Sequence, residues 1–372
     1  MRRTAMFPRL TILFPLIPLM ALPALTAFEG HAFASTITQN VSWTIDRPGS
    51  TTKYRIVAYG DSIFAGYKGS PFEVAIYAAP TVDGDYAQAD WNSDVETIRR
   101  AKSGATAKQI YEDKIVDDAK FMETANTRVV AFEMCGNDAL QARNEFKSQD
   151  GTCDYTKLDD ALADCTKYQL MAMQFINAHA AAGTKRKIVV NLYYAGYDAD
   201  DKTADCTDSS SGEHPNRQDV FLPYLLRMNW RACHFAQQNG FSCEDSFAQF
   251  MGSDYDSNAD GKRDSRALRY RNGETENAYV TRIGTTLRST IRDANEHFVT
   301  ANRSFDYIQS DDTHPTFQGG DTTVGVFTST AKGSSDPRYP DPQYADNKVP
   351  IWRRYGHERM GAGLAVFNPD TP

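Results

Sequence analysis

The sequence lacks several features that mark other classes of protein. None of its six cysteines lies in a C-x-x-C pair, so zinc or dithiol redox chemistry has no support. Lys and Arg number 40 against 48 Asp and Glu, and the net charge of −8 argues against a nucleic-acid-binding surface, which requires a basic face. No internal repeat stands out. Beyond the N-terminal region, no apolar run is long enough to span a membrane.

The N-terminal region has the features of an export signal. Arg2, Arg3 and Arg9 come first, an apolar run covers residues 10–28, and the small-residue site Ala32-Phe33-Ala34 follows. This order predicts a secretory signal peptide over residues 1–34; an uncleaved membrane anchor is the alternative. We therefore expect a secreted or periplasmic chain that is soluble and has no membrane span after cleavage.

All of the cysteines lie beyond this segment, at positions 135, 153, 165, 206, 233 and 243. An even number of cysteines in an oxidising compartment predicts disulfide bonds. The short spacing between Cys153 and Cys165 favours a local disulfide between them, and the other pairings stay open.

Stretches of strand and helix character alternate along the chain. Strands are expected at residues 54–59 (YRIVAY), 128–134 (RVVAFEM) and 187–194 (KIVVNLYY), and helices at residues 106–122, 158–182, 220–239 and 276–301, with a closing element at 349–367. Such alternation predicts an α/β fold with a parallel sheet covered on both faces. A single domain over residues 35–372 is the simplest organisation. The polar segments 195–218 and 318–350 are then long loop excursions.

Gly60-Asp61-Ser62 directly follows the first expected strand. A turn at that point exposes the Ser62 hydroxyl at the carboxyl edge of the sheet, where a nucleophile is accessible. The other interpretation is a helix N-cap formed by Ser62 or Asp61, and both interpretations can hold together. The elbow pattern G-x-S-x-G is absent, which argues against an α/β-hydrolase of that type.

A serine nucleophile needs a base and an orienting carboxylate. Among seven histidines, only His314 has an aspartate three positions earlier, Asp311. A turn can bring Asp311 to Nδ1 of His314 and leave Nε2 free to accept the Ser62 proton. Asp312 competes for the orienting role, and a histidine that merely stabilises the turn is the structural alternative.

Donors for a developing oxyanion are the third requirement. Gly136-Asn137-Asp138 follows a predicted strand, so the Asn137 amide can face the same crevice as Ser62. Ser103-Gly104-Ala105 precedes a predicted helix, where backbone N–H groups are unpaired. Taken alone, each of these segments is an ordinary turn or cap.

With these four blocks in this order, the sequence resembles the SGNH (GDSL-like) hydrolases. The match covers residues 59–67, 101–107, 133–139 and 310–319, and its first block reads Gly-Asp-Ser-Ile. The resemblance implies a flavodoxin-like three-layer α/β/α sandwich with a mainly parallel sheet. It also implies a catalytic triad of Ser62, Asp311 and His314, and an oxyanion hole of the Ser62 and Gly104 N–H groups with the Asn137 side chain.

The activity that this resemblance implies is carboxylic ester hydrolysis through an acyl-serine intermediate, by an esterase or lipase-type enzyme that needs no cofactor. A lipid-like ester and an acetylated carbohydrate both remain open as substrates. The long segments between residues 139 and 310 are not typical of compact family members.

A separate pattern of oxygen ligands indicates a structural calcium loop. Asp256, Asn258, Asp260 and Asp264 occupy positions 1, 3, 5 and 9 of an EF-hand-like stretch, with Gly261 at position 6. A solvated Asp/Asn/Gly turn is the alternative. Functionally, the second hypothesis is a secreted binding protein that keeps the fold, with a calcium-stiffened loop and little turnover.

Overall fold

The computed structural model describes residues 40–65, 91–193, 203–248 and 268–289. The predicted signal peptide, the excursion at 318–350 and the closing element at 349–367 lie outside these residues. The excursion at 195–218 is described from residue 203 onward, and the helix expected at 276–301 is described to residue 289.

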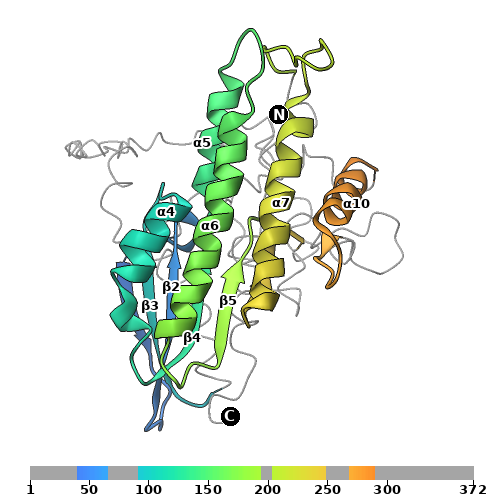
Figure 1. The fold of residues 1–372 in the computed structure, drawn as a ribbon. Coiled ribbons are helices and arrows are strands. Elements are labelled where there is room, and N and C mark those ends of the chain that lie inside the picture. The colour runs from blue at the N-terminus through green and yellow to red at the C-terminus, as the bar shows by residue number, and fades with distance from the viewer. Residues whose placement is uncertain (1–39, 66–90, 194–202, 249–267, 290–372) are drawn as a thin grey trace, which may run out of the picture. The chain divides into compact units, whose positions relative to one another are not determined.

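A six-stranded sheet lies at the centre of the described structure (Figure 1). In spatial order its strands are β1 (Asn40–Ile45), β3 (Asp94–Ala101), β2 (Lys53–Gly60), β4 (Thr127–Glu133), β5 (Arg186–Val190) and β6 (Ser242–Glu244). From β3 to β6 neighbouring strands are parallel, whereas β1 pairs antiparallel with β3. The strands predicted at 54–59, 128–134 and 187–194 correspond to β2, β4 and β5.

Both faces of the sheet are buried, as is usual for parallel strands. Tyr59 and Phe132 point to one face, where they join the core formed with the long helices. Ile56 and Ala131 point to the other face, where they pack with Phe64 of helix α1 (Ser62–Ala65). Numbered along the chain, the parallel strands have the flavodoxin-like order 2-1-3-4-5. The predicted fold class, a three-layer α/β/α sandwich, is confirmed.

Polar side chains near the start of two long helices accept from N–H groups of the first turn. At helix α7 (Arg217–Gln238), the Asn216 side chain accepts from the N–H groups of Gln218 and Asp219. Helix α6 (Thr156–His179) follows Asp154, whose carboxylate accepts from the Thr156 N–H. Helix α10 (Glu276–Ser289) packs beside α7 (Figure 1). Among the helices described, none is long and apolar enough to cross a membrane.

The single helix expected at residues 106–122 is wrong in detail. The segment contains a short α-helix, α4 (Ala107–Ile110), a π-helical turn, η1 (Tyr111–Val116), and a 3-10 turn, η2 (Ala119–Phe121). Its apolar residues Ile110 and Ile115 are nonetheless fully buried. Asp118 lies between the two turns, and its carbonyl accepts from the Tyr59 hydroxyl. The segment thus departs from a regular helix where it contacts the sheet. The spacing of apolar residues along the chain does not predict such contacts.

Three disulfides connect the six cysteines, and the predicted Cys153–Cys165 pair is wrong. The pairs are Cys135–Cys165, Cys153–Cys206 and Cys233–Cys243. Cys165 lies within α6, and the helix carries it away from the loop that holds Cys153, toward the start of helix α5 (Gly136–Lys147), where Cys135 lies.

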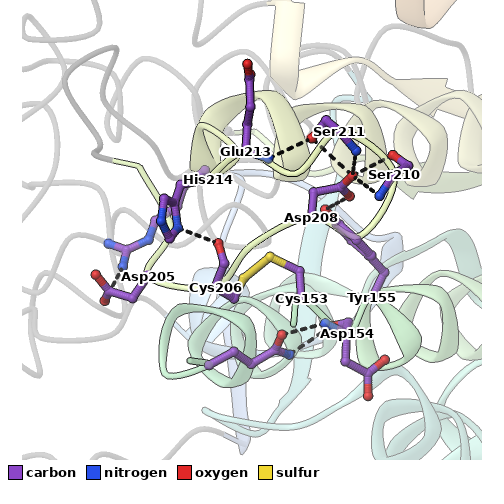
Figure 2. Close-up of a disulfide and its surroundings, with 12 residues drawn as sticks. Cys153, Asp154, Tyr155, Asp205, Cys206, Asp208, Ser210, Ser211, Glu213 and His214 are labelled. Atoms are coloured by element: carbon purple, nitrogen blue, oxygen red, sulfur yellow. Dashed lines mark hydrogen bonds and ion pairs between the residues drawn. A yellow bond between two sulfur atoms is a disulfide. The ribbon is translucent and has the colours of Figure 1, made fainter. Parts of the chain in front are cut away.

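The Cys153–Cys206 disulfide fastens the described part of the 195–218 excursion to the loop between α5 and α6 (Figure 2). Around it, the Asp208 carboxylate accepts from the Tyr155 hydroxyl at 2.8 Å and from the Ser210 and Ser211 N–H groups. The Ser210 hydroxyl also donates to this carboxylate, and that bond first, followed by the bonds from Tyr155 and the two N–H groups, lowers the pKa of Asp208 far below its usual value. From residue 203 onward, the excursion is therefore a loop held in place by a disulfide and by hydrogen bonds to Asp208.

Candidate active site

The candidate site lies where the strand order reverses. The chain leaves β2, forms β3 on one side of it, and then returns to form β4 on its other side. In open α/β sheets of this kind, ligands bind outside the carboxyl ends of the strands at that switch point. Gly60 is the last residue of β2 and Asp61-Ser62 follow it, while residues 134–138 follow β4, so both predicted blocks lie at this edge.

Ser62 is the first residue of α1 and is 6% exposed. The N-cap role that sequence left open between Asp61 and Ser62 belongs to Asp61. Its Oδ1 accepts from the Ile63 N–H at 2.8 Å, and its carbonyl accepts from the Ala65 N–H at 3.0 Å. The Ser62 hydroxyl is therefore not required as the cap of α1.

Asn137 joins the three predicted blocks that the structure describes. Its Nδ2 donates to Asp61 Oδ2 at 3.0 Å and to the Ala105 carbonyl at 2.9 Å. Ala105 follows Gly104, which has a left-handed backbone with φ of 78°. The loops after β2, β3 and β4 therefore meet around one amide, and both of its hydrogens have acceptors.

The residue immediately before the Asn137 block also has a left-handed backbone. Cys135 has φ of 87°, a conformation that non-glycine residues rarely adopt. Its disulfide to Cys165 of α6 anchors this residue, with a Cα–Cα separation of 5.3 Å. Backbone conformations of this kind persist where surrounding structure holds them, and they cluster at functional sites.

Glu133, which the sequence interpretation missed, lies beneath the Ser62 turn. It is the last residue of β4, and its Oε1 accepts from the Asp61 N–H at 2.8 Å and from the Phe64 N–H at 3.2 Å. Burial first, and the neighbouring Asp61 carboxylate second, raise the pKa of Glu133 well above its usual value. The signal in the sequence was an acidic residue directly after the apolar run at residues 129–132.

Neighbouring side chains approach the backbone so closely at this edge that two positions, Gly60 and Gly136, leave little or no room for a Cβ atom. A Cβ on Gly60 would lie 2.6 Å from Glu133 Oε1 and 2.9 Å from the Phe64 Cβ, and a Cβ on Gly136 would lie 3.1 Å from Asp61 Oδ2. The glycine of the first block is therefore required by the space that Glu133 and Phe64 occupy.

Asp138 connects the third block to the second. Its Oδ2 accepts from the Ala107 N–H, at the start of α4, at 2.8 Å. Burial is the largest cause that raises the pKa of Asp138 to about 6, with smaller contributions from the Asp61 and Asp164 charges and an opposing one from backbone hydrogen bonds.

This raised pKa predicts a pH-dependent contribution to stability. The native state holds the Asp138 proton more tightly than the unfolded chain, so the free energy of unfolding should fall as the pH rises from about 4 through about 6. One such group contributes a slope of at most about 1.4 kcal/mol per pH unit. In Asp138→Asn, whose amide oxygen can still accept from Ala107, urea titrations should show a flatter profile. An unchanged profile would contradict the assignment.

The remaining predicted site residues lie outside the described residues. They are the triad partners Asp311 and His314, with the competitor Asp312, and the four ligands of the expected calcium loop, Asp256, Asn258, Asp260 and Asp264. Of the predicted active site, the structure therefore describes Ser62, Gly104 and Asn137.

Several solved structures are similar to this chain at low sequence identity. A lipase from a goat rumen metagenome is 17% identical with a TM-score of 0.43, and the alignment covers 70% of this chain and 90% of the lipase. Phospholipase A1 from Streptomyces albidoflavus is 16% identical with a TM-score of 0.37, covering 54% and 82% of the two chains. An acetylxylan esterase from Geobacillus stearothermophilus is 16% identical with a TM-score of 0.33, covering 65% and 95%.

No protein-family model and no curated protein sequence matches the chain. Because the identities and TM-scores of the structural neighbours are this low, the chemistry of the site has to be inferred from the residues of this chain.

Proposed function

We propose that this chain is an exported serine ester hydrolase of the SGNH type, with Ser62 as its nucleophile. The observation that carries the proposal is the convergence of the Ser62, Gly104 and Asn137 segments at the switch point of a flavodoxin-like sheet. A serine beside backbone N–H groups and a side-chain amide is the arrangement that acyl transfer needs.

In the proposed mechanism, His314 removes the Ser62 proton as the hydroxyl attacks the ester carbonyl, and Asp311 orients the imidazole. The oxyanion forms against the Ser62 and Gly104 N–H groups and the Asn137 amide. Collapse expels the alcohol, which takes its proton from His314, and leaves an acyl-serine. Water, deprotonated by His314, then releases the acid and restores Ser62.

Export to an oxidising compartment is part of the proposal. The six cysteines form three disulfides, and bonds of this kind persist outside the reducing cytosol. This fits the secretory signal peptide that the N-terminal sequence predicts.

The function is tested by assaying the purified protein on p-nitrophenyl esters of short and long acyl chains. We expect turnover of at least one ester without added metal, and unchanged turnover in EDTA. Preference for the long chains would favour a lipid-like substrate, whereas preference for the acetyl ester would favour an acetylated carbohydrate. No hydrolysis of any ester by folded protein would contradict the proposal and favour a binding protein that retains the fold.

A further inference from the structure

We propose that Glu133 is a positioning residue, which holds the Gly60–Ser62 turn in the geometry that the nucleophile needs. The inference rests on the proposed function, because it assigns Glu133 a part in the reaction of Ser62. Glu133 acts through the backbone of the turn and does not itself touch the substrate.

The contacts of Glu133 lie on both sides of Ser62. Its Oε1 accepts from the Asp61 N–H, before the serine, and from the Phe64 N–H, after it. A single oxygen therefore fixes the backbone on both flanks of the nucleophile. Gly60 makes this approach possible, since a Cβ at that position would lie 2.6 Å from Oε1.

Glu133 also supports Asp61, which holds the rest of the site together. Burial first, then the Asp61 charge and a side-chain hydrogen bond between the two carboxyl groups, raise the pKa of Glu133. Asp61 in turn accepts from Ile63 and from the Asn137 amide. Ser62 and the proposed oxyanion donor are thus linked through Glu133 and Asp61.

The protonation state of Glu133 should therefore affect the reaction. Asp61 is the charged group that faces Glu133 from the β2–α1 turn, and Asp138 of α5 adds its charge next to Asp61. When Glu133 loses its proton, two buried carboxylates repel one another directly beneath Ser62. Rising pH should therefore displace the turn and lower kcat, in addition to any effect of His314.

The test compares Glu133→Gln and Glu133→Ala by kcat and KM on p-nitrophenyl acetate across the pH range. Gln keeps an acceptor for both N–H groups and offers its amide to Asp61, so kcat should stay within about threefold, and the alkaline fall in kcat should be reduced. Ala loses both acceptors, and kcat should fall by about 10–100-fold with little change in KM, the effect expected from a small displacement of a reacting group.

Asp245→Asn is the matched control. Asp245 is a partly buried acid whose pKa is raised by desolvation, and it accepts from the backbone N–H groups of Tyr270 and Ala248, beyond the end of β6. Its replacement should alter stability while leaving kcat and its pH profile unchanged. Equal loss of kcat in the control and in Glu133→Ala would overturn the inference by showing a general effect of losing such an acid.

The outcomes separate this inference from the proposed function. An inactive wild-type protein would overturn both, whereas an active wild type with full kcat in folded Glu133→Ala would overturn the positioning role alone. If Glu133→Ala does not fold, Glu133→Gln decides. A wild-type alkaline fall that persists unchanged in Glu133→Gln, or a Gln variant with a severe loss of kcat, would overturn the role.

Discussion

Replacing Ser62 with alanine is expected to lower kcat for ester hydrolysis by more than about 10⁴-fold, because no other group in the proposed site would form the acyl intermediate. The variant should remain folded. Asp61, and not Ser62, caps α1, so the substitution removes one hydroxyl without removing the cap. Thermal unfolding of the two proteins should therefore be similar while activity differs.

Covalent labelling provides an independent measurement of the same assignment. A fluorophosphonate should modify Ser62 in the wild type, as mass spectrometry of the proteolysed protein would show. Ser148→Ala is a suitable control, because Ser148 ends α5 and donates to the Glu145 carbonyl, away from the proposed nucleophile. Label on a different serine, together with retained activity in Ser62→Ala, would exclude Ser62 as the nucleophile.

Replacing Asn137 with alanine is expected to lower kcat by about 10²–10³-fold with little change in KM, as loss of one preorganised oxyanion donor does. In the structure, both amide hydrogens have acceptors, Asp61 and the Ala105 carbonyl. We infer that the oxyanion replaces one of these acceptors in the transition state. The fall should therefore appear in the chemical step and not in the binding of the ester.

The same amide also stabilises the site, so folding has to be measured alongside kinetics. Leaving Asp61 and Ala105 without their donor should cost about 1–3 kcal/mol of unfolding free energy. Asn229→Ala is the control: Asn229 is a buried amide that bonds both the N–H and the carbonyl of Leu192. It should lose similar stability while its kcat stays within about threefold. A rise in KM with unchanged kcat for Asn137→Ala would instead indicate ground-state binding.

Local apolar patterns were sufficient to predict the central strands. β2, β4 and β5 each contain a short uninterrupted apolar run, at residues 56–59, 129–132 and 188–190, because parallel strands are buried on both faces. β3 (DVETIRRA) was missed because four charged residues interrupt its apolar pattern, and two of them pair with residues from other segments. Glu96 pairs with Arg55 at 2.7 Å, and Arg100 pairs with Asp118 at 2.7 Å.

Disulfide pairing required the tertiary structure. Proximity along the chain favoured Cys153–Cys165, whereas the fold joins Cys135 to Cys165 and Cys153 to Cys206. Pairing depends on which Cα atoms approach within about 7 Å, and this is decided by how α6 packs against its neighbours.

The sequence by itself determined the fold class and the order of the candidate motifs, since strand and helix periods and a Gly-Asp-Ser turn after a strand are local properties of the chain. Only the tertiary structure assigned the cap of α1 to Asp61, joined Asn137 to Asp61 and Ala105, and revealed Glu133 beneath the turn. Glu133 and Asp61 are 72 positions apart. Their contact, and the proton held by the buried pair, arise only when β2 and β4 become neighbours and exclude water from the carboxyl groups.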